Sequence, residues 1–309
     1  AETMASGTTT DYALTDVDAI TVSGTTSLVA LGRTALADNR PAFYRKTSAT
    51  DISSSWQFYA SGVNNVVPQS LIVVKSTASA DAFAYCLGNT GSAYNLQKFD
   101  GVSAVSNEGT LAGYDSSVVA RPFVHPEEGG VIYMVAGNII SKYNANTDTF
   151  TATAFTLPSN MVGVSLTYLG LYLVIICRPK NGVGDSMMYF WGRDTSISTL
   201  QESISIGSSQ GNIVENLENQ LYVITSGLVV GQYTNILQNK LTARVYTGTT
   251  LKVVKELTLS SSFGTGLNNF KVKKGDKVYF GLPNDTALYV FGLNKQGRYF
   301  MGQDRKSVV

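Results

Sequence analysis

Residues 131–150 read VIYMVAGNIISKYNANTDTF and contain two elements that recur through this chain of 309 residues. The first element is an apolar run that begins with an aliphatic residue and often ends in glycine. The second is a strand-like segment with an aromatic residue that leads into a polar turn. Short apolar runs that alternate with Gly, Asn, Asp and Ser are typical of β-strands and their turns. Helical periodicity is scarce elsewhere, so the stretch predicts a sheet protein.

The aromatic element occurs six times at a nearly constant spacing. Its copies are FYRKTSATD at 43–51, YNLQKFDG at 94–101, YNANTDTF at 143–150, FWGRDTS at 190–196, YTGTTLK at 246–252 and FGLNKQG at 291–297. The lead aromatics are Tyr44, Tyr94, Tyr143, Phe190, Tyr246 and Phe291. Successive lead aromatics are 50, 49, 47, 56 and 45 residues apart, which indicates an internal repeat of about 49 residues.

An apolar run precedes every copy of the aromatic element. The runs are LVALG at 28–32, LIVVK at 71–75, VIYMVAG at 131–137, LYLVII at 171–176, LYVITSG at 221–227 and VYFGL at 278–282. Several copies are followed by a further strand, such as SSWQFYA at 54–60 and LKVVKELTL at 251–259. The second repeat is the least regular, because STASADAFAYCLGNTGSAY allows two strand registers. Each repeat therefore predicts three or four short strands.

A period near 50 residues with three or four strands per repeat is typical of β-propeller blades. One such sheet cannot bury both of its faces, so it stacks on its neighbours and the ring closes at about six sheets. We expect an all-β fold, a single β-propeller domain over 1–309, with the apolar runs as its innermost strands. The approximate blades are 15–62, 63–112, 118–160, 161–207, 211–260 and 263–303. Seven blades, a two-sheet sandwich and a β-solenoid remain alternatives.

Composition and charge narrow the functional classes. Apolar residues make up 44% of the chain, enough for a sizeable core, whereas only 15% are charged. A net charge of +1 predicts no nucleic-acid partner. The longest apolar run, LGLYLVIIC at 169–177, is too short to cross a membrane, so we expect no membrane insertion. The polar N-terminus AETMASGTTT predicts no signal peptide in the chain.

Residues that could carry chemistry are few. The single histidine, His125, lies in a proline-flanked loop typical of a surface residue, and no GxSxG motif accompanies it. Glu127 and Glu128 are adjacent, so in an extended segment they would point to opposite faces. Cys86 and Cys177 lie in apolar runs typical of buried, inert thiols. We therefore expect no enzyme and no catalytic, cofactor-binding or metal-binding residues.

Two further segments favour structural interpretations. The lysine-rich stretch KVKKGDK at 271–277 has Gly275 and Asp276 at its centre, which predicts a hairpin turn between solvated strand ends. Trp56, Tyr189 and Trp191 could stack on sugars, but their positions in the repeats favour packing between blades.

The segment ATDISSSW at 49–56 resembles a degenerate Asp box, the turn motif of sialidase-type propellers. Asp51, Ser55 and Trp56 fit the motif, whereas Ala49 and Ser53 depart from it. The resemblance implies a structural role, in which the aspartate caps a turn between outer strands and the tryptophan packs in the blade. It implies no catalytic residue.

The whole chain resembles β-propeller repeat proteins of kelch-like length, and more loosely the propellers of bacteriophage tails and other virion parts. This second resemblance implies a non-enzymatic structural subunit of a virion or phage tail. Its expected partners are other copies of itself, other virion or tail proteins and a host surface glycan.

Two alternatives stay open. One is a carbohydrate-binding or sialidase-like carbohydrate-processing propeller, which would be secreted. The other is a kelch-type scaffold, which would carry a Gly-Gly pair in each repeat, whereas only Gly129–Gly130 occurs here.

Overall fold

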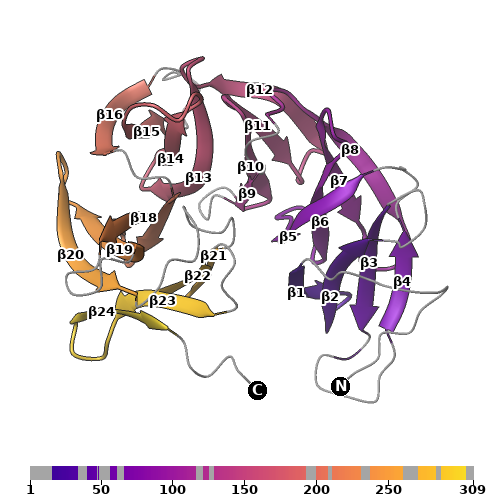
Figure 1. Cartoon of the computed structure of the whole chain (residues 1–309). Helices are drawn as coiled ribbons and strands as arrows, with labels where there is room; N and C mark the ends of the chain where they lie inside the picture. Colours follow the sequence, from indigo (N-terminus) through magenta and orange to yellow (C-terminus); the bar gives the residue numbers. More distant parts are fainter. Residues whose placement is uncertain are drawn as a thin grey trace. The chain divides into compact units, whose positions relative to one another are not determined.

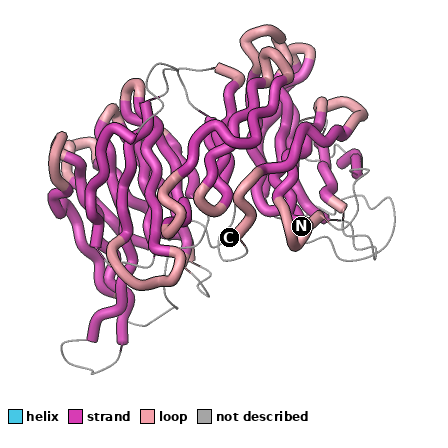
Figure 2. Tube along the Cα trace, turned by 90° about the horizontal axis from the view of Figure 1, so that it is seen from above, coloured by secondary structure: helices cyan, strands magenta, loops and turns pink. Residues whose placement is uncertain are grey.

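The computed structural model describes most of the chain as β-structure. The described residues are 16–33, 40–46, 48, 56–60, 66–115, 121–124, 129–192, 200–207, 211–230, 237–259, 271–282 and 287–303. Strands, turns and loops account for all of them, with no helix in this part of the chain (Figure 2). The strands form six four-stranded sheets, and in each sheet every strand pairs antiparallel with its neighbour in sequence. This meander needs only short turns between strands.

The chain divides into two compact units, residues 1–157 and 158–309, and each unit contains three sheets (Figure 1). In unit 1, sheet 1 comprises β1 (Asp16–Val22), β2 (Thr25–Arg33), β3 (Pro41–Lys46) and β4 (Trp56–Ala60). Sheet 2 comprises β5 (Val67–Lys75), β6 (Ala82–Asn89), β7 (Tyr94–Phe99) and β8 (Val105–Leu111). Sheet 3 comprises β9 (Arg121–Val124), β10 (Val131–Ala136), β11 (Ile139–Asn144) and β12 (Thr149–Thr156).

Unit 2 repeats this arrangement. Sheet 4 comprises β13 (Met161–Leu169), β14 (Tyr172–Pro179), β15 (Ser186–Gly192) and β16 (Leu200–Gly207). Sheet 5 comprises β17 (Gly211–Leu217), β18 (Gln220–Val230), β19 (Leu237–Tyr246) and β20 (Leu251–Thr258). Sheet 6 comprises β21 (Lys271–Lys274), β22 (Lys277–Gly281), β23 (Leu288–Leu293) and β24 (Tyr299–Gln303). The six sheets fall within the six predicted blade ranges, and the prediction that they make one domain stays a prediction.

The repeat maps onto equivalent strands, as predicted. Each lead aromatic lies on the third strand of its sheet, from Tyr44 on β3 to Phe291 on β23. Five of the apolar runs lie on second strands. The exception is residues 71–75, which belong to the first strand β5, whereas the second strand of sheet 2 is β6. The ambiguous second repeat is thereby assigned a register.

The expectation that the apolar runs are the innermost strands is wrong. First strands of adjacent sheets contact one another, as β1 contacts β5, β5 contacts β9 and β13 contacts β17. Fourth strands also contact one another, as β8 contacts β12 and β20 contacts β24. The second strand is the more apolar because it pairs on both edges and is covered on both faces; β10, for example, is buried throughout.

Aromatic side chains join neighbouring sheets within each unit. Ring centroids of Tyr85 and Tyr143 lie 5.4 Å apart between sheets 2 and 3. Phe190 and Tyr246 lie 5.1 Å apart between sheets 4 and 5. Phe291 of sheet 6 lies 5.4 Å from Tyr222 of sheet 5. Such pairs add about 0.5–1.5 kcal/mol each beyond the buried area. The repeated aromatics therefore mark the faces on which sheets stack.

Candidate functional site: a polar network on the first strands of unit 2

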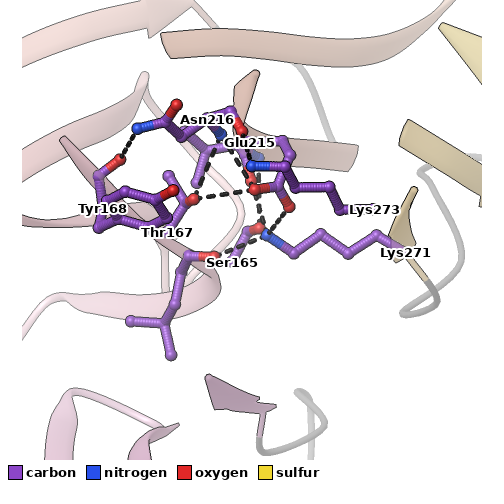
Figure 3. A network of polar contacts seen from close by, with 9 residues as sticks. Ser165, Thr167, Tyr168, Glu215, Asn216, Lys271 and Lys273 are labelled. Atoms are coloured by element: carbon purple, nitrogen blue, oxygen red, sulfur yellow. Dashed lines mark hydrogen bonds and ion pairs between the residues drawn. The ribbon is translucent and has the colours of Figure 1, made fainter. Parts of the chain in front are cut away.

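A buried polar network joins the first strands of the three sheets in unit 2 (Figure 3). First strands carry polar side chains because their outer edge has no strand partner. The network comprises Ser165, Thr167 and Tyr168 on β13, Glu215 and Asn216 on β17, and Lys271 and Lys273 on β21. Glu215 is 5% exposed and Asn216 is 1% exposed. A carboxylate at this depth requires close partners.

Glu215 has partners on both carboxylate oxygens. Its Oε1 accepts hydrogen bonds from the Thr167 hydroxyl at 3.1 Å and from the Asn216 backbone N–H at 3.0 Å. Its Oε2 lies 3.1 Å from the Lys271 ammonium. Three polar groups from three sheets thus compensate the buried charge.

Lys271 connects all three sheets through one ammonium group. Besides its ion pair with Glu215, it donates to the carbonyl of Leu166 at 2.6 Å and to the carbonyl of Val214 at 2.7 Å. An ammonium group has three N–H donors. These three oxygens can use all of them, so Lys271 serves to hold β13, β17 and β21 together.

Lys273 and Asn216 retain hydrogen-bonding capacity, and we call them the Lys273–Asn216 edge. The exposed Lys273 donates to the Asn216 backbone carbonyl at 2.5 Å and lies 5.8 Å from the ring centroid of Tyr168. The Asn216 Nδ2 donates to the Tyr168 carbonyl at 2.9 Å, which fixes the amide orientation. Among the described residues, no donor reaches the buried Oδ1 of Asn216. This edge can accept and donate hydrogen bonds to a ligand.

The lysine-rich stretch is only partly as predicted. β21 and β22 form a hairpin, and Gly275 in its turn has φ of +61°. The expectation of solvated strand ends is wrong for Lys271, whose side chain is only 16% exposed. Its charge is neutralised by Glu215 on the neighbouring sheet, a residue that the linear sequence places 56 positions away. The one local signal was a charged residue inside the apolar segment IVENL at 213–217.

The aromatic residues weighed as sugar platforms pack inside the protein. Tyr189 and Trp191 are each 8% exposed. Trp56 packs with Phe58 against the cluster that contains Tyr44. These contacts confirm the packing interpretation and the structural role that the Asp-box resemblance implied for Trp56. Asp51, Ser55, His125, Glu127 and Glu128 lie outside the described residues.

Both cysteines are buried and unbonded to each other, as predicted. Burial raises the pKa of the Cys177 thiol well above its usual value. The described ranges contain no cluster of three or more His, Cys, Asp or Glu that could hold a metal ion. We find no helix among the described residues with the length and hydrophobicity needed to cross a membrane.

In unit 1, Asn146 links sheets 2 and 3. Its Oδ1 accepts from the Ser76 hydroxyl at 2.8 Å and from the Thr77 N–H at 2.7 Å, and its Nδ2 donates to the Gly129 carbonyl at 2.7 Å. A Cβ on Gly130 would lie 2.5 Å from this side chain. The Gly-Gly pair therefore accommodates a clasp between sheets. The adjoining loop, residues 75–80, lines an open hollow of about 570 Å³, but Asn146 already engages its Ser76 and Thr77.

A second contact between sheets 2 and 3 involves the Tyr143 hydroxyl. It donates to Asp148 and lies 3.1 Å from Glu108 Oε2. The hydrogen bond from Tyr143 lowers the pKa of Asp148, and the Lys98 ammonium at 3.6 Å acts in the same direction. Burial, with the bond to Asp148, raises the pKa of Tyr143. This cluster also serves packing, because each group is held by a neighbour.

Comparisons with known proteins identify the fold. No family model matches the chain, and no curated protein matches it significantly. A solved candidate 6-phosphogluconolactonase from Bacteroides uniformis aligns with TM-score 0.57 and 10% identity over 92% of this chain and 82% of that one. A second, from Bacteroides fragilis, aligns with TM-score 0.56 and 8% identity over 91% and 80%. The fucose-complexed lectin of Aleuria aurantia aligns with TM-score 0.45 and 15% identity over 93% of both chains.

The chain has a β-propeller fold, as the repeat predicted. The main functional expectation, a structural subunit of a virion or phage tail, is overturned. The solved structures that share the fold carry the name of a carbohydrate-acting enzyme, and the comparisons give no link to virions. The physical reason for the error is that low charge and Ser/Thr/Gly richness reflect short strands and tight turns. Those features belong to the fold and not to one function. The expectation that the protein is no enzyme likewise has no support.

Proposed function

We propose that this protein is a carbohydrate-binding propeller that holds a sugar or sugar derivative at the Lys273–Asn216 edge. The carrying observation is the buried Asn216 Oδ1, which lacks a donor beside an ammonium group with unused N–H donors. A buried oxygen without a hydrogen bond costs about 1–3 kcal/mol. A ligand hydroxyl that donates to it would recover part of that energy.

The chemistry of the edge suits a polyhydroxylated ligand. Lys273 can donate to ring or hydroxyl oxygens, while Asn216 Oδ1 accepts a hydroxyl proton. Tyr168 adds an aromatic ring next to both groups. Sugar sites combine a few placed polar groups with such a ring. The names of the two Bacteroides structures, which share the fold, also favour a carbohydrate ligand.

The network favours binding over acid–base chemistry. A general base needs a free oxygen within reach of the proton that it removes. Both oxygens of Glu215 already have partners, and Lys271 neutralises its charge. We therefore place Glu215 and Lys271 as the support of the edge, with Lys273 and Asn216 as the binding groups.

Saturation-transfer NMR with a panel of neutral and acidic monosaccharides and their lactones tests the proposal. We expect signal from at least one sugar, and a weaker signal for Lys273→Ala. Lys274→Ala is the matched control, because Lys274 is also exposed and is the next residue on β21, facing the opposite side. The same samples are assayed for lactone hydrolysis. Absence of binding across the panel, with the protein folded by circular dichroism, would overturn the proposed function.

A further inference from the structure

The charges around the Lys273–Asn216 edge do not cancel. Glu215 and Lys271 lie 3.1 Å apart and neutralise each other. Lys273 adds a positive charge, and no carboxylate among the described residues pairs with it. The hairpin that carries it adds Lys274 and Lys277 against one acid, Asp276. The edge is therefore electropositive although the whole chain carries a net charge of only +1.

The Lys273 ammonium is also held in place. Its bond to the Asn216 carbonyl and its position over Tyr168 restrict a side chain that would otherwise move freely. An ordered cation loses less entropy when it pairs with an anion than a free one does. Hydrogen bonds that involve a charged group are also about twice as strong as neutral ones. A cation fixed in this way is suited to select an anionic group.

We propose that the ligand is an anionic sugar derivative, in which a carboxylate or phosphate pairs with Lys273 and a hydroxyl donates to Asn216 Oδ1. This inference rests on the proposed function and adds the charge of the ligand to it. Lys273 is then a specificity-determining residue, because a neutral sugar meets only the hydrogen-bonding part of the edge. Carboxylate and phosphate share the required charge, so the experiment includes both.

Isothermal titration calorimetry with glucose, gluconate and glucose 6-phosphate separates the possibilities. We expect at least one of the two anions to bind about tenfold more tightly than glucose, as a charge-assisted hydrogen bond predicts. The preferred anion identifies the carboxylate or the phosphate as the recognised group. Raising the salt concentration from about 50 to 200 mM should weaken the anion but not glucose, because salt screens exposed charges.

Variants of the two adjacent lysines assign the effect. Lys273→Gln should remove the preference for the anion, Lys273→Arg should retain most of it, and Lys274→Gln should leave it unchanged. Equal affinities for glucose and both anions, unaltered by Lys273→Gln, would overturn the anionic ligand while leaving sugar binding in place. Failure of all three ligands and of the wider sugar panel would overturn the proposed function, and the inference with it.

Discussion

At the scale of single residues, Lys271 is the side chain that most depends on the fold. Its ammonium joins three sheets through Glu215 and two backbone carbonyls. Removing one partner of a buried ion pair leaves an uncompensated charge, which is more costly than removing both. The residue scale therefore offers a direct test of the network that supports the candidate site.

We expect Lys271→Met to lower the free energy of unfolding by about 3–5 kcal/mol, because Glu215 then stays buried without a cation. Adding Glu215→Gln to that variant should restore part of the loss. Urea denaturation of the full chain measures both effects. Lys252→Met on the exposed strand β20 is the control and should change stability by no more than about 0.5 kcal/mol. Equal stability of the Lys271 and Lys252 variants would mean that the buried pair does not form.

At the scale of elements, the hairpin turns decide where sheets can stack. The β10–β11 turn contains Gly137, whose φ is +57°. It sits against the chain that leaves sheet 2, since a Cβ on Gly137 would lie 2.1 Å from the Gly113 carbonyl oxygen. The β13–β14 turn contains Gly170 with φ of +55°, and a Cβ there would meet nothing within 4 Å. The two turns share a backbone conformation and differ only in their surroundings.

This pair predicts different costs for the same substitution. Gly170→Ala should cost about 1–2 kcal/mol, the strain of a left-handed alanine. Gly137→Ala should cost at least about 1 kcal/mol more, because the methyl group also displaces backbone of the neighbouring segment. Thermal and urea unfolding of the two variants measure the difference. If both lose the same stability, the β10–β11 turn does not pack against Gly113.

At the scale of the whole molecule, sheets depend on their neighbours for burial. Sheets 2 and 3 share one apolar cluster that includes Tyr85, Leu96, Ile132 and Tyr143. Neither sheet covers both of its faces alone, and a repeat architecture gains most of its stability from such interfaces. Each unit is therefore expected to fold only with all three of its sheets.

Deletion of residues 120–160 removes sheet 3 completely and exposes the apolar face of sheet 2. We expect the shortened chain to lose cooperative folding and to aggregate. Thermal melting followed by circular dichroism, with size-exclusion chromatography, checks this outcome. Deletion of residues 1–15, which precede the first strand, is the control and should leave the melt cooperative. A soluble deletion variant of 120–160 that melts in one sharp transition would contradict the dependence of sheets on one another.

Much of the candidate site could not be read from the chain. The hairpin at 275–276 was predictable because Gly-Asp is a local turn signal. The partnership of Lys271 with Glu215 was not, because the two residues belong to different sheets and no local pattern specifies which first strands lie side by side. The same holds for Asn146, whose partners Ser76 and Thr77 are about 70 residues earlier.

The sequence by itself determined the number and order of the sheets. Alternating apolar runs, lead aromatics such as Tyr143 and turn residues are local properties that act within about 50 residues. Only the tertiary structure decided which strand of each sheet is innermost, because the most apolar run is the one with two paired edges. It also decided which polar groups meet. Glu215 lies among apolar residues in the chain, and only the approach of β21 gives it a cation and leaves Lys273 and Asn216 with capacity for a ligand.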